Sequence, residues 1–390
     1  MSSQISRLLA VLLVACCFSA FGCTSEKQSR GTPASEASIV VTDLAGREVT
    51  IAQPVRRIVL MRSLCIYELA TVLGDETAER LVAWDSSLKT GDRDTYDKFV
   101  ERFPELKETK VLGDVLKDAV SAESVLALKP DLIIMNTYMQ QRKSNGLQRL
   151  EDAGVPILYL KFDDPFQDPQ KSIRLLGKVL GKEERAKEAA DWVDAQLAEV
   201  LQRQESIQGA VPTVYIEAGT HGSGQYGNTF GSNEEGRVAN WAGVMAQLRC
   251  KNIAAGVVSG LYGMGVIRPE YLFTQDPDAV VITGASWSAF PDSLRLGYFA
   301  EQQTASRTLR SFTERTGWKN LKAIQNEKLY GIHARFGSHI TSFAAAQQIS
   351  KWLYPNEFGD LRPGDNLRIF HEKFLPVQFS GTWMVGLPNE

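Results

Sequence analysis

The feature that most constrains the fold of this chain is a segment that occurs twice. Residues 121–134 (SAESVLALKPDLII) and 268–282 (RPEYLFTQDPDAVVI) each place a Glu in the first turn of a short helix. In both copies a Pro-Asp turn and an apolar strand follow. A short helix leading into a buried strand is the unit of a parallel α/β sheet. The length and order of the match predict two halves built in the same way.

Further strands and helices flank both copies. An apolar alternation on either side of Ala45-Gly46 predicts a hairpin over 39–51. In the first half the predicted strands are 57–61, 81–84, 132–135 and 155–160, and the predicted helices are 67–73, 122–128 and 147–153. In the second half the predicted strands are 213–216, 279–282 and 329–332, and the predicted helices are 238–248 and 342–353.

A long charged segment connects the two halves. Apolar residues recur at helical spacing from 169 to 205, with charged residues on the other positions. This pattern predicts a long connecting helix, in one piece or in two pieces interrupted at Gly177 or Gly181.

The composition excludes several classes of protein. The 390 residues carry 43 Lys and Arg against 46 Asp and Glu, a formal net charge of -3, which offers no basic footprint for nucleic acid. A hydrophobic share of 44% with 23% charged residues is typical of a globular chain and excludes a disordered one. Five Cys are too few for a disulfide scaffold, and Cys65 and Cys250 are expected to be buried free thiols.

The N-terminus has the pattern of an export signal. Residues 8–21 are apolar or small, and this run of 14 residues is shorter than the roughly 20 of a spanning helix. We therefore predict a signal peptide over 1–22. Gly22-Cys23 at its end resembles a bacterial lipobox, with Cys16 as the alternative acylated residue. The polar residues 23–38 would then form a flexible tether behind a lipid anchor.

A Gly-rich segment follows the strand at 213–216. Gly222 to Gly227 matches G-x-G-x-x-G, but no helix begins directly after it, as a dinucleotide site requires. A binding loop and a plain surface loop both fit better. The chain contains no G-x-S-x-G, no H-E-x-x-H and no paired Cys and His, so we predict that it is not an enzyme; an α/β hydrolase is the enzyme alternative.

The order of these segments resembles a known family. The leader, the hairpin, RRIVLM, LALKPDLII, the connecting helix, DPDAVVITG and LKAIQNEKLYGI occur in the order found in class III solute-binding proteins of ABC importers, in the iron-complex (siderophore or haem) and cobalamin group. The resemblance covers 39–375. It implies two Rossmann-like α/β lobes with parallel-type sheets, joined by a long rigid helix, with the ligand in a cleft between them.

The resemblance also implies a division of the chain and a function. The N-terminal lobe is expected over 39–165, the linking helix over 166–206 and the C-terminal lobe over 207–390. The protein would be a lipid-anchored exported protein that captures a ligand, without a cofactor of its own, and delivers it to a permease dimer with its ATPase subunits. Glu123 and Glu270 match the acids with which this family docks on its permease.

Residues at strand ends are candidates for the cleft, because ligands of α/β proteins bind at the carboxyl ends of strands. The candidates are Arg62, Ser63, Tyr67, Trp84, Tyr138, Arg142, His221, Tyr226, Trp287, His333, Arg335 and His339. Arg62-Ser63 stands where the metal-binding branch of the family has a ligand His. Because Arg pairs with anions and does not coordinate a cation, an anionic ligand is favoured.

The identity of the ligand stays open between several classes. A ferric siderophore-like chelate is the preferred ligand. No clear Tyr-Pro motif follows the second strand, where haem binders of this group often carry one, which places haem behind the siderophore and a corrinoid. With four His in the chain, a direct metal-ion site at His333 and His339, facing His221, is a weaker alternative, as is an oxoanion.

Overall fold

The structure is a computed structural model that describes residues 37–387 except 141–144, 233–239 and 259–262. Arg142, Cys16 and Cys23 lie outside the described residues. Among the described residues, no helix combines the length and the apolar character that crossing a membrane requires.

The N-terminal lobe contains a hairpin and a parallel sheet. The strands of the hairpin are β1 (Ser38–Thr42) and β2 (Glu48–Ala52), which pair in antiparallel fashion as predicted. The sheet has the order β5-β4-β3-β6-β7, and every neighbouring pair is parallel. Its strands are β3 (Ile58–Met61), β4 (Leu81–Trp84), β5 (Lys110–Val111), β6 (Leu132–Asn136) and β7 (Ile157–Leu160).

Helices connect the strands of this sheet. They are α1 (Ile66–Leu73), α2 (Thr77–Arg80), α3 (Ser87–Gly91), α4 (Arg93–Arg102), α5 (Ala122–Leu126), α6 (Thr137–Gln140) and α7 (Asn145–Asp152). α1 ends at Gly74, whose φ of 56° is a conformation that glycine adopts without steric cost. α4 begins at Asp92, whose side chain accepts a hydrogen bond from the N–H of Thr95.

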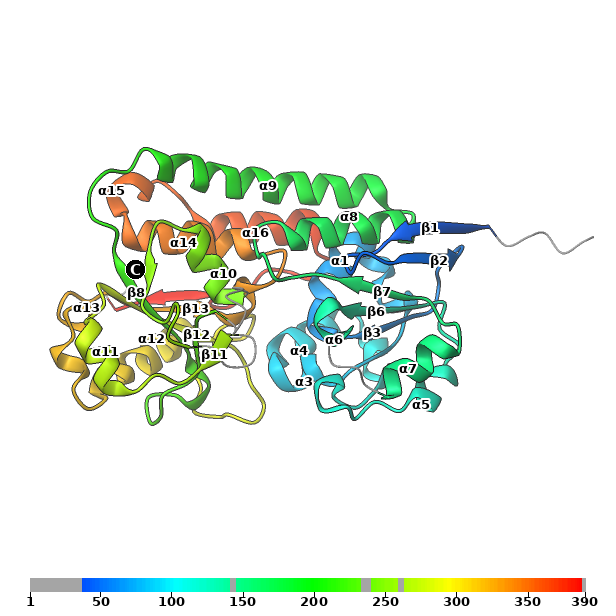
Figure 1. The fold of residues 1–390 in the computed structure, drawn as a ribbon, viewed down its shortest axis with the longest axis horizontal. Coiled ribbons are helices and arrows are strands. Elements are labelled where there is room, and N and C mark those ends of the chain that lie inside the picture. The colour runs from blue at the N-terminus through cyan, green and yellow to red at the C-terminus, as the bar shows by residue number, and fades with distance from the viewer. Residues whose placement is uncertain (1–36, 141–144, 233–239, 259–262, 388–390) are drawn as a thin grey trace, which may run out of the picture. The chain divides into compact units, whose positions relative to one another are not determined.

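The connecting segment is two helices rather than one. α8 (Asp168–Leu180) ends at Gly181, which adopts the left-handed conformation, and α9 (Glu183–Glu205) follows. Of the two glycines at which an interruption was expected, Gly181 is where the chain turns. α9 packs along α8 and also contacts α14, as Figure 1 shows. The long helix that reaches both lobes is therefore α9.

The C-terminal lobe contains a mixed sheet of seven strands. Its strands are β8 (Thr213–Ala218), β9 (Thr229–Phe230), β10 (Lys251–Asn252), β11 (Met264–Gly265), β12 (Ala279–Gly284), β13 (Leu329–His333) and β14 (Met384–Gly386). The central strands β8, β12 and β13 are parallel, as predicted, while β9, β11 and β14 pair in antiparallel fashion. The sequence pattern did not reveal these three short strands.

The helices of this lobe lie on both sides of its sheet. They are α10 (Asn240–Gln247), α11 (Pro269–Gln275), α12 (Gln302–Ser311), α13 (Lys322–Gln325), α14 (Ser342–Leu353), α15 (Pro355–Phe358) and α16 (Pro363–Phe374). The repeated segment is confirmed as a structural repeat, because α5 leads into β6 as α11 leads into β12.

Alternate residues of the central strands enter different apolar clusters. Leu60 and Ile134 on one face of the N-terminal sheet belong to the same buried cluster as Val193 of α9 and Val281 of β12. The opposite face of each sheet has its own cluster. This alternation is expected of strands covered on both faces. It gives each lobe two apolar layers and joins the lobes through α8, α9 and α14.

Candidate binding site between the lobes

A loop of the C-terminal lobe contacts α3 and α4 of the N-terminal lobe. The carbonyl of Ser286 accepts a hydrogen bond from the N–H of Arg93 at 2.9 Å. Ser288 donates its N–H to the carbonyl of Thr90 at 3.0 Å and its hydroxyl to the carbonyl of Lys89 at 2.8 Å. The carboxyl end of β12 is thereby held against the loop that follows β4.

An ion pair also joins the lobes. Arg295 donates to both carboxylate oxygens of Asp94, at 2.7 and 3.2 Å. Asp94 is buried and also accepts the N–H of Phe299 at 3.2 Å. The N-terminal end of α4 is therefore a fixed part of the contact between the lobes.

Next to this contact lies a group of charged and aromatic residues, which we name the interlobe arginine site. It consists of Arg62, Tyr67 and Asp92 from the N-terminal lobe and His333 and Arg335 from the C-terminal lobe. Arg335 follows β13 and donates to the carbonyl of Gly91 across the interface at 3.2 Å. Arg62 follows β3 and is near enough to influence the ionisation of Arg335. The topology thus brings together two predicted residues that lie far apart in the sequence.

Neither arginine of this site has a carboxylate partner among the described residues. Arg62 and Arg335 form no ion pair, and the Nε of Arg335 is buried without an acceptor. Burial lowers the pKa of Arg335, and the charge of Arg62 lowers it further, while Asp92 opposes both effects. The site is therefore short of negative charge.

Asp92 is an acid whose charge acts on Arg335, and burial disfavours its ionised form. Burial raises the pKa of Asp92 to about 6, although Arg335 and the hydrogen bonds from Thr95 act in the opposite direction. Its Oδ2 accepts the hydroxyl of Thr95 at 2.9 Å and lies 3.6 Å from Nε2 of His333. Asp92 therefore neutralises the arginines only in part.

His333 is completely buried, and neither ring nitrogen has a hydrogen-bond partner among the described residues. Its ring packs edge-on against Trp383 at 4.6 Å and Phe336 at 5.4 Å between centroids. Burial lowers the pKa of His333 well below its usual value, and Arg335 adds to the effect. The imidazole is therefore neutral at pH 7 and presents a nitrogen lone pair and an N–H.

Tyr67 and His339 border the site and have partners of their own. The hydroxyl of Tyr67 shares a hydrogen bond with Thr95 at 3.0 Å, and burial raises the pKa of the phenol. His339 lies 3.1 Å from the buried carboxylate of Glu68, and its ring centroid lies 6.4 Å from that of Tyr67. Both residues fix the wall of the site across the two lobes.

Three further candidates have structural contacts inside the N-terminal lobe. The hydroxyl of Ser63 is buried, donates to Asp85 at 2.6 Å and accepts the N–H of Leu88 at 2.8 Å. Trp84 is buried against Tyr96. Tyr138 is the second residue of α6 and is partly buried. Ser63 acts by fixing the turn that presents Arg62.

The remaining candidates of the C-terminal lobe do not belong to the interlobe arginine site. His221 is exposed and packs edge-on against Phe290 at 5.0 Å, and Trp287 is half-buried in the loop that contacts α3. Tyr226 accepts the indole N–H of Trp318 at 2.8 Å and lies under the guanidinium of Arg315. Tyr226 is thus part of a structural cluster with Arg315 and Trp318.

The two predicted docking acids are exposed in matching positions. Glu123 lies in the first turn of α5 and pairs with Arg149 at 2.9 Å. Hydrogen bonds from its own backbone N–H and from Ser121 hold the pKa of Glu123 below its usual value. Glu270 lies in the first turn of α11 and is exposed, and its carboxylate has no partner among the described residues.

Sequence reasoning missed three polar residues that build the interface. Asp92, Asp94 and Arg295 are buried or paired across the lobes, but none of them follows a strand directly. The signal for Asp92 was present in Asp92-x-x-Thr95, a spacing that marks the start of a helix. No local signal indicates that Arg295 meets Asp94, because 201 positions separate them.

The described residues contain no group of three or more His, Cys, Asp or Glu that could hold a metal ion. His333 and His339 face different carboxylates, Asp92 and Glu68. The arrangement instead offers two cations, a neutral imidazole and aromatic surface between two α/β lobes. These features define a ligand-binding protein of the two-lobed type.

Comparison with known proteins shows the family directly. The model of the periplasmic binding protein family matches residues 71–336, so this chain belongs to that family. The solved structure of the TroA-like periplasmic binding protein FepB of Veillonella parvula is 31% identical and has a TM-score of 0.81. The match covers 90% of this chain and 99% of that protein.

Two curated relatives are more distant. The uncharacterised ABC transporter substrate-binding lipoprotein YvrC of Bacillus subtilis is 23% identical, over 90% of this chain and 96% of its own. The molybdate-binding protein MolA of Haemophilus influenzae is 22% identical, over 87% and 92%. The chain is accordingly a substrate-binding protein of an ABC transporter. Such proteins are not enzymes, and they work with permease and ATPase components.

Proposed function

We propose that this protein captures an anionic iron chelate of the ferric siderophore type between its lobes and delivers it to the permease. Arg62 from the N-terminal lobe and Arg335 from the C-terminal lobe would hold the negative charge. The observation that carries the proposal is the absence of an ion-pair partner for either arginine among the described residues.

The energetics of burial support an anionic ligand. A buried charge without a counter-charge is costly, and two like charges that meet at an interface add repulsion. An anion bound to both groups removes both costs and gains charge-assisted hydrogen bonds of about 1.5–3 kcal/mol each. Because the arginines come from different lobes, the bound anion also stabilises the contact between them.

A small oxoanion is the second candidate. It is favoured by the likeness to MolA, whose name records molybdate binding. Two arginines and the neutral His333 suit a compact tetrahedral anion as well as a larger chelate. Haem and a corrinoid remain alternatives with the same fold. The two propionates of haem would also pair with the arginines, whereas the shortage of negative charge gives no preference for a corrinoid.

A panel of ligands distinguishes these candidates. We would titrate the purified protein with a negatively charged ferric tris-catecholate, an uncharged ferric tris-hydroxamate, molybdate, haem and cobalamin, and follow tryptophan fluorescence. The proposal predicts binding of the ferric catecholate and no binding of the hydroxamate at the same concentration. Preference for the uncharged chelate, or for cobalamin, would contradict it.

Export, anchoring and docking belong to the same proposal. We infer that Cys23 carries a lipid anchor outside the cytoplasmic membrane, supported by the leader and by the likeness to the lipoprotein YvrC. Glu123 and Glu270 would meet the two permease subunits, supported by their exposure at equivalent helix starts. Cys23→Ser should block anchoring, and Cys16→Ser is the matched control; the reverse result would assign the anchor to Cys16.

A further inference from the structure

A buried acid and a buried histidine from different lobes face each other in the interlobe arginine site. Oδ2 of Asp92, at the start of α4, lies 3.6 Å from Nε2 of His333, at the end of β13. Both residues are completely buried, and neither ring nitrogen of His333 has a partner among the described residues. A separation of 3.6 Å is too long for a hydrogen bond. One proton between these two side chains, which we call the Asp92–His333 pair, would give the pair a hydrogen bond that it lacks.

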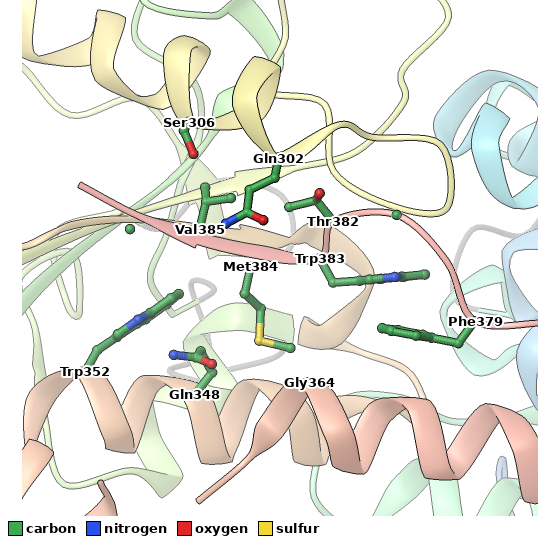
Figure 2. Close-up of a pocket in the computed structure, with 12 residues that line it drawn as sticks. Gln302, Ser306, Gln348, Trp352, Gly364, Phe379, Thr382, Trp383, Met384 and Val385 are labelled. Atoms are coloured by element: carbon green, nitrogen blue, oxygen red, sulfur yellow. The ribbon is translucent and has the colours of Figure 1, made fainter. Parts of the chain in front are cut away.

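Neighbouring residues of the C-terminal lobe enclose this pair. The ring of His333 packs edge-on against Trp383, and Trp383 in turn stacks on Phe379 at 6.0 Å between centroids. Figure 2 shows these two aromatic rings next to each other in the segment that leads into β14. On another side lies Gly297, where a Cβ would be 3.4 Å from Nε2 of His333. Because the pair is buried, nearby charges act on it with little screening by solvent.

Two charges act directly on the carboxyl group of Asp92. Burial raises its pKa to about 6, while among its neighbours Arg335 lowers the pKa and Asp94 raises it. The charge of Asp94 is balanced by Arg295 at 2.7 Å. Arg335, which in turn senses the charge of Arg62, is therefore the main group that keeps Asp92 ionised at pH 7.

The other titratable neighbours of the pair are phenols and imidazoles from α1, α16 and the loops before α12 and α14. They are Tyr67, Tyr298, His339 and His371. Burial raises the pKa of both phenols and lowers the pKa of His371 to about 4, so these three groups are neutral between pH 6 and 8. His339 is paired with Glu68 at 3.1 Å. A proton taken up between pH 6 and 8 therefore has Asp92 as its first acceptor and His339 as the rival.

An anion held by Arg62 and Arg335 would change the balance at this pair. It would neutralise the charge with which Arg335 stabilises the carboxylate of Asp92, and its own negative charge would repel that carboxylate. Both effects favour the protonated acid. Because the pKa of Asp92 is already about 6, a modest further rise leaves the group protonated at pH 7. Linkage is reciprocal, so a proton on the pair also strengthens the binding of the anion.

We propose that the Asp92–His333 pair takes up one proton from solvent when the interlobe arginines bind an anion, so that the anion is held more tightly as the pH falls. The proton binds to a carboxylate oxygen of Asp92 and is shared with the lone pair of Nε2 of His333. This inference rests on the proposed function and adds to it the regulation of the same site.

Isothermal titration calorimetry in buffers of different ionisation enthalpy counts the protons that are taken up on binding. The probes are the negatively charged ferric tris-catecholate and molybdate. The wild type should take up about one proton per anion at pH 7 and bind roughly tenfold more weakly at pH 8 than at pH 6, within the limit of tenfold per pH unit for one proton. Binding without proton uptake would overturn this inference alone. Failure of both probes to bind would overturn it together with the proposed function.

A matched pair of variants assigns the proton. Asp92→Asn keeps a residue that can cap α4, and it should bind the anion with no proton uptake and no dependence on pH. Asp97→Asn removes an exposed acid of the same helix, paired with Arg93, and should behave as the wild type does. Proton uptake that persists in Asp92→Asn would place the proton on another group, such as His339, and would contradict the proposal.

A measurement without ligand tests the role of Arg335 in the same pair. Carboxyl ¹³C signals followed by NMR report the titration of Asp92, which the Asp92→Asn spectrum identifies. In Arg335→Ala the carboxyl group of Asp92 should titrate at a higher pH than in the wild type, because the charge that lowers its pKa is gone. An unchanged titration would mean that neutralising Arg335 does not reach Asp92, and the proposed coupling would be wrong.

Discussion

Two arginines of the C-terminal lobe lie close together in the sequence and in opposite physical states. Arg315 is 8% exposed and donates to both oxygens of Glu217 at 2.9 Å, with further bonds to three carbonyls of the Gly-rich loop. Within the part of the chain that the structure describes, Arg335 forms one hydrogen bond, to the carbonyl of Gly91, and its Nε has no acceptor. The difference separates an arginine that maintains the fold from one that is available to a ligand.

The hydrogen bonds of Arg315 explain the conformation of the Gly-rich loop at 222–227. Arg315 bonds the carbonyls of Gly222, Ser223 and Gln225, and Glu217 accepts the N–H of Gly227 at 2.8 Å. A Cβ at Gly227 would lie 1.8 Å from the carbonyl oxygen of Ala218, so no other residue fits there. Gly227 therefore serves a close approach of the backbone to β8, and phosphate binding is not needed to explain it.

The largest effect is expected at the satisfied arginine. Arg315→Ala leaves the buried carboxylate of Glu217 without its counter-charge, which should lower the free energy of unfolding by about 3–5 kcal/mol. The midpoint of urea unfolding measures this. Arg368→Ala, at an exposed ion pair on α16, is the control and should unfold as the wild type does. A loss below about 1 kcal/mol for Arg315→Ala would mean that Arg315 stabilises the fold no more than an exposed ion pair does.

The next effect concerns Asp92, the acid beside the unsatisfied arginine. Its pKa is about 6 in the fold, above the usual 3.8, so the folded protein holds this proton where the unfolded chain has lost it. The contribution of Asp92 to stability is therefore complete below about pH 4 and falls as the pH rises through 6, by at most about 3 kcal/mol. Asp92→Asn should gain stability over the wild type across this window.

The measurement is the difference in free energy of unfolding between wild type and Asp92→Asn at several pH values. The difference is needed because His333, whose pKa burial lowers, acts in the opposite direction in the wild type. Because His333 lies 3.6 Å from Asp92, the same difference is also measured in a His333→Gln background, where the imidazole no longer titrates. A difference that does not change with pH would mean that Asp92 is ionised in the fold and neutralises Arg335 fully.

The smallest effect on stability is expected at the docking acids. They repeat, at the surface, the comparison between a charged side chain with partners and one without. Among the described residues Glu123 has partners and the carboxylate of Glu270 has none, yet both side chains are exposed. Reversing both charges to Lys should leave unfolding and ligand affinity unchanged and should abolish ligand-stimulated transport in reconstituted vesicles. Normal transport by the double variant would remove these acids from the docking surface.

More of the fold than of the site could be predicted from the sequence. The strands of the two sheet centres are short apolar runs bounded by turns, and each one was found where it was expected, as with β3 and β12. The short strands β5, β9, β10 and β11 were missed because they have two residues each, too few for any periodicity. β14 was missed because its pairing with β13 joins positions more than fifty residues apart.

The limit of prediction from the sequence is clearer for the binding site than for the fold. Positions at strand ends predicted that Arg62 and Arg335 lie near one another, because parallel strands bring their carboxyl ends to one edge of each sheet, and the charge of Arg62 does act on Arg335. The same argument also selected Trp84 and Ser63, whose side chains turn out to be buried inside the lobe. Strand ends identify a backbone position, while the direction of each side chain depends on packing that no local pattern records.

The most direct test of the account is the affinity of Arg62→Ala, Arg335→Ala and the double variant for the anion that binds best in the ligand panel. Isothermal titration calorimetry measures each dissociation constant, and urea unfolding confirms that each variant folds. Arg368→Ala serves as the matched control. Each single variant should bind ten- to a hundredfold more weakly, as the loss of a charge-assisted hydrogen bond of about 1.5–3 kcal/mol requires.

We also predict that Arg335→Ala is at least as stable as the wild type, because burial and the charge of Arg62 already disfavour the charge of Arg335. The predicted result is therefore weak binding by a fully folded protein. If both single variants and the double variant bind the anion as tightly as Arg368→Ala does, the interlobe arginines do not hold the ligand, and the central claim is wrong.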